Sequence, residues 1–126
     1  MTGTGPAVVI ADDDDDIREL VAFKLSNAGY EVTTASDGVE ALEAIRSTSP
    51  ALAILDVMMP GLSGLDVLRR LRDGEGPEGC RVILLTARAR DSEVDSGFAA
   101  GADDYVIKPF SPRELLRRVD ALLDRH

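Results

Sequence analysis

The sequence predicts an α/β fold: a single doubly wound domain whose five-stranded parallel sheet has helices on both faces. First, short apolar runs alternate with segments of helical periodicity, which implies right-handed crossovers between parallel strands. Second, most of these runs are apolar on both faces, as is typical of strands buried between two layers of helices. Third, a length of 126 residues suits one domain with a substantial core.

Five strands are predicted in chain order. Ala7–Ala11, Leu52–Leu55 and Val82–Leu85 are continuous apolar runs, which indicate central strands. Tyr30–Ala35 alternates apolar and polar residues, so we expect this strand to lie at an edge of the sheet. The last run, Tyr105–Ile107, is short, and a proline that cannot continue a central ladder follows within two residues.

Five helices are predicted between and after the strands, because apolar residues recur there at helical spacing. Gly29 is placed to end the first helix, and Ser111 to cap the last one with Pro112 in its first turn. The helix over Asp91–Ala100 is the weakest, because its apolar stripe is thin. The stripes consist of Ile17, Leu20, Val21, Leu25 and Ala28, then Val39, Leu42 and Ile45, then Leu65, Leu68 and Leu71, then Val94 and Phe98, and finally Leu115, Val119, Leu122 and Leu123.

The composition excludes several classes of function. A net charge of −9 repels phosphate backbones, so the chain by itself is not expected to bind nucleic acid directly. No apolar run approaches the ~20 residues of a membrane-spanning helix, and the N-terminus lacks the basic residues of a signal peptide. Cys80 is the only cysteine, so no internal disulfide can form. We expect a cytoplasmic domain over residues 6–126 behind a flexible tail over residues 1–5, without contact to a membrane.

Polar residues close four of the predicted strands. Ligands of open parallel sheets bind at the carboxyl ends of the strands. Three carboxylates, one hydroxyl and one ammonium group are therefore expected to meet at one edge of the sheet. These residues are Asp12 and Asp13 after the first strand, Asp56 after the third, Thr86 after the fourth and Lys108 after the fifth.

The three carboxylates predict a site for a hard divalent cation. Asp12 and Asp13 directly follow a buried strand and should lie near Asp56. Crowded carboxylates raise one another's pKa unless a cation intervenes. Oxygen ligands suit Mg²⁺, and Mn²⁺ is a possible substitute. For the acidic residues 14–16, capping of a helix and interaction with its dipole is an equally good interpretation.

Asp56 is the predicted acceptor of a phosphoryl group. It heads a loop in which Pro60 and Gly61 turn the chain away, so its carboxylate is expected to be exposed beside the metal. A carboxylate accepts a phosphoryl group when the charge on the transferring oxygens is neutralised. Lys108, at the end of an apolar strand, and the Thr86 hydroxyl are placed to supply that neutralisation.

Together these motifs resemble the receiver domain of two-component response regulators. The resemblance is carried by Val8–Asp14, Leu55–Gly61, Leu85–Ala87 and Gly101–Phe110, and it extends from about Pro6 over nearly the whole chain. It implies the strand order 2-1-3-4-5 that is known for this fold, in agreement with an edge position for the second strand. It also implies a signalling switch that receives its phosphoryl group from a phosphohistidine of a sensor histidine kinase.

The resemblance assigns the metal ligands. Asp56 would be the phosphoacceptor and would hold Mg²⁺ directly, together with Asp13. Asp12 would act on the metal through water, and the backbone carbonyl of Met58 would complete the protein ligands. The only catalysis it implies is Mg²⁺-dependent phosphoryl transfer to the chain itself and dephosphorylation. We expect the dephosphorylation to be slow, because the apolar Met58 side chain cannot orient a hydrolytic water.

The resemblance also assigns the switch. Thr86 and Lys108 would contact the phosphoryl oxygens, and Tyr105 would turn inward as Thr86 moves. By residue type alone, Tyr105 is equally well explained as an aromatic residue of an edge strand. The Lys108–Pro109 peptide would be cis. The fourth helix, fifth strand and fifth helix would form a face for a homodimer. Lys108–Leu115 resembles regulators that carry a DNA-binding effector domain, and we expect no such domain within these 126 residues.

Three other classes stay open from the residues. A haloacid-dehalogenase-like phosphatase also uses Mg²⁺ and a strand-end Asp, but it needs a second Asp where Met58 stands. A flavodoxin-like electron carrier needs a hydroxyl-rich phosphate loop after the first strand, where residues 12–16 are all acidic. An interaction domain that is never phosphorylated would use the same polar residues structurally.

Overall fold

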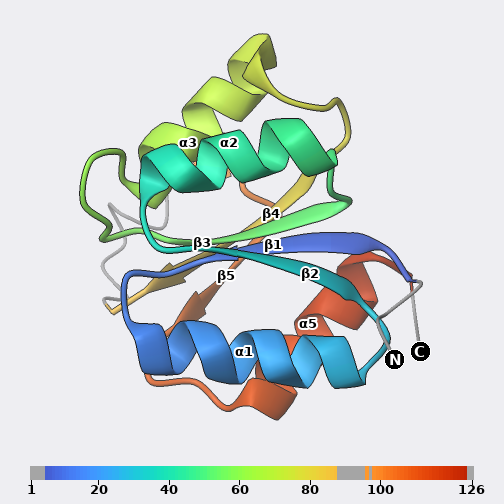
Figure 1. Cartoon of the computed structure of the whole chain (residues 1–126). Coiled ribbons are helices and arrows are strands. Elements are labelled where there is room, and N and C mark those ends of the chain that lie inside the picture. The colour runs from blue at the N-terminus through green and yellow to red at the C-terminus, as the bar shows by residue number, and fades with distance from the viewer. Residues whose placement is uncertain (1–4, 88–95, 97, 125–126) are drawn as a thin grey trace.

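A single parallel sheet in the order β2-β1-β3-β4-β5 forms the centre of the computed structural model, which describes residues 5–87, 96 and 98–124. Helices α1 and α5 cover one face of this sheet, and α2 and α3 cover the other (Figure 1). The strands are β1 (Ala7–Ala11), β2 (Glu31–Ala35), β3 (Leu52–Asp56), β4 (Arg81–Thr86) and β5 (Asp104–Ile107). The helices are α1 (Asp15–Asn27), α2 (Gly38–Thr48), α3 (Gly64–Arg70) and α5 (Pro112–Leu122), and a π-helical turn, η1 (Leu71–Glu75), continues α3.

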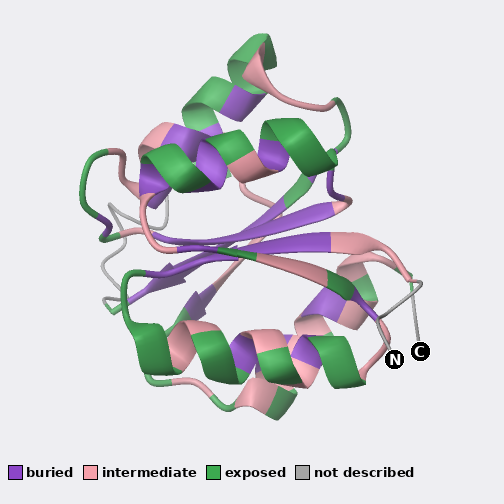
Figure 2. Ribbon diagram, in the orientation of Figure 1, coloured by how far each residue is buried: buried purple, intermediate pink, exposed green. Residues whose placement is uncertain are grey.

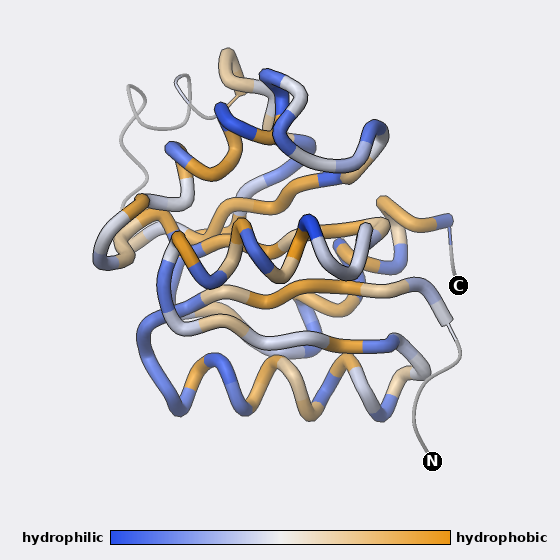
Figure 3. The backbone as a smooth tube through the Cα atoms, turned by 45° about the horizontal axis from the view of Figure 1, so that its top comes forward, coloured by the Kyte–Doolittle hydropathy of each residue, from blue (hydrophilic) through white to orange (hydrophobic). Residues whose placement is uncertain are grey.

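The central strands are buried on both faces, as their continuous apolar runs predict (Figure 2). Successive residues of a strand point to opposite faces, so each strand contributes to two cores. In β3, Leu55 packs into the core under α2 and α3, whereas Ile54 packs into the core under α1 and α5. Figure 3 shows the consequence as hydropathy: the central strands are mainly hydrophobic, and the helices switch between hydrophobic and hydrophilic residues.

The predicted strand order and the edge position of β2 are confirmed. β2 pairs in register only with β1 and exposes Glu31 and Thr34. β3 and β4 each extend to the polar residue that follows their apolar run, so Asp56 and Thr86 are the last residues of these strands. The sheet therefore carries its polar groups at the carboxyl ends of its central strands.

The predicted helix ends are also confirmed. Asp14 caps α1, because its carboxylate accepts hydrogen bonds from the amides of Asp16 at 3.0 Å and Ile17 at 3.1 Å. Gly29 follows the end of α1 with a φ of 97°, a conformation that only glycine adopts without strain. Ser111 caps α5, and a proline begins that helix.

Three described residues of the predicted apolar stripes face solvent. Leu20 on α1 is 53% exposed, Val39 on α2 is 52% exposed and Phe98 is 48% exposed, whereas Val21 and Leu42 in the first two stripes are buried. A helical stripe read from the sequence is wider than the strip that the sheet covers, so residues at its margin stay outside the core.

Part of the prediction falls outside the described residues. The fourth predicted helix, over 91–100, lies mostly there, and within its described part residues 96, 98 and 99 are helical. The described residues thus contain four α-helices where the sequence predicts five. Residues 1–4 of the predicted tail are outside the description as well. No helix among the described residues has the length and apolar character needed to cross a bilayer.

Candidate metal and phosphoryl site

Three carboxylates meet at the carboxyl ends of β1 and β3, as the sequence predicts. One oxygen each of Asp12, Asp13 and Asp56 lies within 4.8 Å of the others. Asp12 and Asp56 are buried, with exposures of 0% and 4%, whereas Asp13 is exposed. The expectation of an exposed Asp56 is wrong, because the loop after β3 and the start of α3 lie close against this residue. Two carboxylates are thus fixed inside the protein, and the third joins them from the solvent side.

Lys108 brings its ammonium group to the two buried carboxylates. Its Nζ lies 2.9 Å from Oδ2 of Asp12 and 3.3 Å from Oδ2 of Asp56. The Lys108 amide donates to the carbonyl of Thr86 at 2.7 Å, which ties the end of β5 to the end of β4. The peptide between Lys108 and Pro109 is cis, as the resemblance implies.

The site has a surplus of negative charge. Burial, together with the neighbouring Asp12, raises the pKa of Asp56 to about 7, although Lys108 acts in the opposite direction. Burial acts to lower the pKa of Lys108, but its contacts with Asp12 and Asp56 raise that pKa above its ordinary value. One ammonium group is therefore shared between two buried carboxylates, with Asp13 adding a further charge.

This donor set fits a hard divalent cation. All the clustered ligand atoms are carboxylate oxygens. Oxygen ligands are preferred by hard cations such as Mg²⁺ and Mn²⁺ and less so by softer metals. A pocket opens to solvent at the cluster, so a small ion and a phosphoryl group have access. The lining residues of this pocket are Asp13, Asp14, Asp56, Met58, Ala87 and Lys108.

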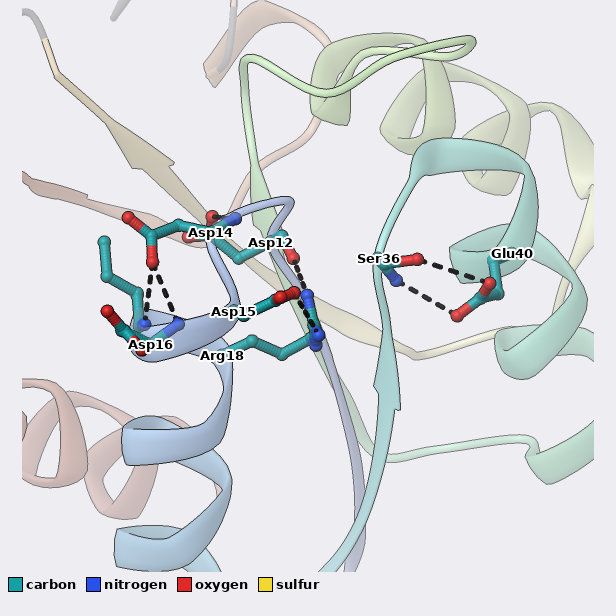
Figure 4. A network of polar contacts seen from close by, with 8 residues as sticks. Asp12, Asp14, Asp15, Asp16, Arg18, Ser36 and Glu40 are labelled. Carbon is teal, nitrogen blue, oxygen red and sulfur yellow. Dashed lines mark hydrogen bonds and ion pairs between the residues drawn. The ribbon is translucent and has the colours of Figure 1, made fainter.

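The turn after β1 is held by hydrogen bonds from three directions. The amide of Asp14 donates to Oδ1 of Asp12 at 2.9 Å, and the amide of Asp12 donates to the carbonyl of Ala35 at 3.2 Å. Arg18 donates from Nη1 to the carbonyl of Asp12 at 2.9 Å (Figure 4). Arg18 could not be predicted as part of the site, because an arginine in the first turns of an amphipathic helix has the pattern of a solvated residue.

The loop after β3 fixes the Asp56 carboxylate from its own chain. The amide of Met58 donates to Oδ1 of Asp56 at 3.2 Å, and the Met58 side chain is 73% exposed at the pocket. Gly64, which begins α3, approaches the backbone of Asp56 so closely that a Cβ there would lie 2.3 Å from its carbonyl oxygen. Glycine is therefore required where α3 starts, directly beside the strand end that presents Asp56.

Thr86 and Tyr105 lie on the same face of the sheet. Thr86 is 6% exposed at the end of β4, opposite Ile107, and Tyr105 is paired two residues earlier with Leu84. Residues two apart share a face, so both side chains lie on the side of Leu84, in the core under α2 and α3. The Tyr105 ring also meets Phe98 edge to face, with 5.4 Å between the ring centroids.

Comparison with known proteins gives matches along most of the chain. The family model described as "Response regulator receiver domain" matches residues 8–120. The chain is 40% identical over 119 residues to the DNA-binding response regulator MtrA of Mycobacterium tuberculosis strain H37Rv, covering 94% of this chain and 51% of that protein. It is 43% identical over 120 residues to the phosphate regulon transcriptional regulatory protein PhoB of Rhizobium meliloti, covering 95% and 53%. The chain thus spans about half the length of these curated relatives.

The fold also matches that of a solved structure. The receiver domain of the Francisella response regulator 1452 superposes with a TM-score of 0.88 at 37% sequence identity. This alignment covers 95% of the present chain and 98% of the other.

Proposed function

The chain belongs to the response regulator receiver domain family, and on that premise we propose that it is a two-component signalling switch activated when Asp56 accepts a phosphoryl group. The observation that carries the proposal is the buried Asp56 carboxylate, which shares a site with two other carboxylates and lies 3.3 Å from the Lys108 ammonium. The phosphatase alternative finds no support, because the family match covers residues 8–120 and Met58 occupies the place of its second Asp.

Receiver domains bind Mg²⁺ at an acidic site, and we assign that role here to the described acidic cluster. Asp13 and Asp56 would hold Mg²⁺, or Mn²⁺ in its place, directly. Asp12 would act through water, and the Met58 carbonyl would be a further ligand. The clustering of the three carboxylates and the raised pKa of Asp56 support this assignment. When bound, the cation neutralises charge on the phosphoryl oxygens during transfer.

The transfer step uses an oxygen of Asp56 as nucleophile. This oxygen forms a bond to phosphorus while the bond from phosphorus to the imidazole nitrogen of the phosphohistidine breaks. The electron pair of the broken bond stays on the imidazole. Lys108, already beside the Asp56 carboxylate, would then pair with the phosphoryl group, and the hydroxyl of Thr86 would bind a second phosphoryl oxygen.

Phosphorylation would change the conformation of the face that contains β5 and α5, and this face would contact the partner. Thr86 and Tyr105 share one face of the sheet, so movement of the first toward the phosphoryl group would open space for the second.

We propose a sensor histidine kinase as the phosphodonor and a homodimer through the fourth helix, β5 and α5 as the active form. Because MtrA and PhoB are named as DNA-binding and transcriptional regulators, we also propose a DNA-binding effector as the output and a cytoplasmic location.

Intact-protein mass spectrometry after treatment with acetyl phosphate and Mg²⁺ tests the proposal. We expect the mass of one added phosphoryl group on the wild type and none on Asp56→Ala. Asp16→Ala, which changes an exposed acid of the same region, serves as the matched control and should be labelled normally. A wild type without added mass, or a label that persists in Asp56→Ala, would refute the proposal. Steady turnover of many phosphate esters would favour a phosphatase.

A further inference from the structure

Arg18 spans the turn between β1 and α1 with two separate nitrogens. Its Nη1 donates to the carbonyl of Asp12 at 2.9 Å, and its Nη2 contacts Oδ1 of Asp15 at 2.6 Å (Figure 4). The side chain is only 15% exposed although it carries a full charge. A solvated arginine on a helix surface needs neither a backbone acceptor nor burial. The two contacts of Arg18 therefore indicate a structural role for this side chain.

The carbonyl that Arg18 holds belongs to the peptide between Asp12 and Asp13. A peptide group is planar, so fixing its oxygen also fixes the amide of Asp13 and the start of that residue. Asp12 has further restraints on its carboxylate, from the amide of Asp14 and from Lys108. Asp13 is exposed, so packing does not restrain its carboxylate. The direction of the Asp13 side chain therefore depends on the orientation of this peptide.

We propose that Arg18 is a positioning residue of the metal site, which orients the Asp13 carboxylate toward Asp56 by holding the Asp12–Asp13 peptide. The inference rests on the proposed function, in which Asp13 and Asp56 hold the cation. Asp15 offsets the charge of Arg18, so the guanidinium adds little repulsion toward a bound cation. The residues of the acidic run thus have different roles. Asp12 and Asp13 belong to the metal site, Asp14 caps α1 and Asp15 pairs with Arg18.

The test compares Mg²⁺ affinity in Arg18→Gln and in the wild type by isothermal titration calorimetry. We expect Arg18→Gln to bind Mg²⁺ about tenfold more weakly, an effect in the range of one lost charge-assisted hydrogen bond. The amide resonance of Asp13 should shift in the metal-free variant, because its peptide loses the tether. Both readouts are taken well below the unfolding temperature, where a loss of global stability alone does not change them.

Arg46 provides a matched control on α2. It donates from Nε to the carbonyl of Glu75 at 2.9 Å and pairs through Nη2 with the Glu75 carboxylate at 2.7 Å, so it repeats the two kinds of contact that Arg18 makes. None of its contacts involves the acidic cluster. Arg46→Gln should therefore leave Mg²⁺ affinity and the Asp13 resonance unchanged, whatever it does to the unfolding temperature.

Arg18→Lys keeps the charge and the helix propensity but has a single nitrogen for two acceptors, so it too should weaken Mg²⁺ binding. It also gives the result if Arg18→Gln does not fold. Wild-type Mg²⁺ affinity in either folded Arg18 variant would overturn the inference. A wild type that binds Mg²⁺ but takes no phosphoryl group would refute the proposed function and not the role of Arg18, whereas a wild type without Mg²⁺ binding would refute both.

Discussion

The charged cluster at the amino ends of β4 and β5 is partly exposed and its anion has two arginine partners, whereas the cluster at the carboxyl ends of β1 and β3 buries two carboxylates around one ammonium group. At the amino ends, Arg72 donates to the carbonyls of Cys80 and Gly101 and also pairs with Asp103. Asp103 in turn accepts from a backbone amide of β4 and lies 3.6 Å from Arg81. Asp103 thus has two arginine partners, and both backbone carbonyls have a donor.

At the carboxyl ends, one ammonium group serves two buried carboxylates. Lys108 lies between Asp12 and Asp56, and the pKa of Asp56 is raised to about 7 because burial and Asp12 outweigh Lys108. The comparison separates two uses of the same residue types. A partly exposed cluster in which the anion and the backbone carbonyls all have donors stabilises the fold, whereas a buried cluster with more carboxylates than cations is ready to bind a cation.

Removal of the Lys108 charge should give the largest effect on stability. In Lys108→Met two buried carboxylates lose their shared cation, so we expect the free energy of unfolding in the absence of metal to fall by about 3 kcal/mol. Urea unfolding measures this change, with Lys24→Met on α1 as a control. Added Mg²⁺ should return more stability to Lys108→Met than to the wild type. Equal losses in the two variants would contradict the unbalanced picture of the site.

The raised pKa of Asp56 predicts a pH-dependent difference between the metal-free wild type and Asp56→Asn. Because the folded-state pKa of about 7 lies above the ordinary 3.8, ionisation of Asp56 costs stability as the pH rises between these values. Asp56→Asn should match the wild type below pH ~4 and be more stable by a few kcal/mol above pH ~7. Thermal unfolding across this range measures the difference, and a constant gap at all pH values would contradict it.

The cluster around Asp103 should respond to mutation in stability alone. Arg72→Met removes the arginine donor from two backbone carbonyls and one of the two arginine partners of Asp103, so we expect a loss of about 2 kcal/mol in unfolding free energy. Phosphorylation by acetyl phosphate should proceed at the wild-type rate. Arg69→Met, which removes an exposed pair at 3.8 Å, should change stability by less than about 0.5 kcal/mol. A slow phosphorylation rate in Arg72→Met would show that the two ends are not independent.

The smallest expected effect concerns loss of the phosphoryl group. The apolar Met58 side chain cannot orient a water beside Asp56, whereas an amide in Met58→Asn can, so dephosphorylation should accelerate on the order of tenfold. Decay of the phosphorylated species, followed by mass spectrometry, gives the rate. Val39→Asn, which replaces an exposed apolar residue on α2, should decay like the wild type. An unchanged rate in Met58→Asn would show that the side chain at position 58 does not limit dephosphorylation.

The strands and the main site residues were predictable because both depend on short-range patterns. A run such as Leu52–Leu55 indicates a central strand, and the first polar residue after it marks the carboxyl end where ligands bind. The convergence of Asp12, Asp56 and Lys108 follows from the parallel arrangement of the strands. The assigned chemical roles of these residues stay predictions until phosphorylation is measured.

Other features depend on three-dimensional detail that no local pattern contains. The exposure of Leu20 and Val39 is set by how much of each helix the sheet covers. The tether from Arg18 depends on the path of the turn after β1, because its acceptor is a backbone carbonyl and has no signature in the residue types. The shared use of Lys108 by two carboxylates depends on distances of 2.9 and 3.3 Å that only the folded chain defines.

The contact of Gly64 with the backbone of Asp56 limits how this protein can be redesigned. Even a methyl group at position 64 would collide with the strand end, so the first turn of α3 and the acceptor residue cannot be altered independently. Engineers who wish to retune the lifetime of the signal should therefore work from the solvent side of the pocket and leave this seam intact.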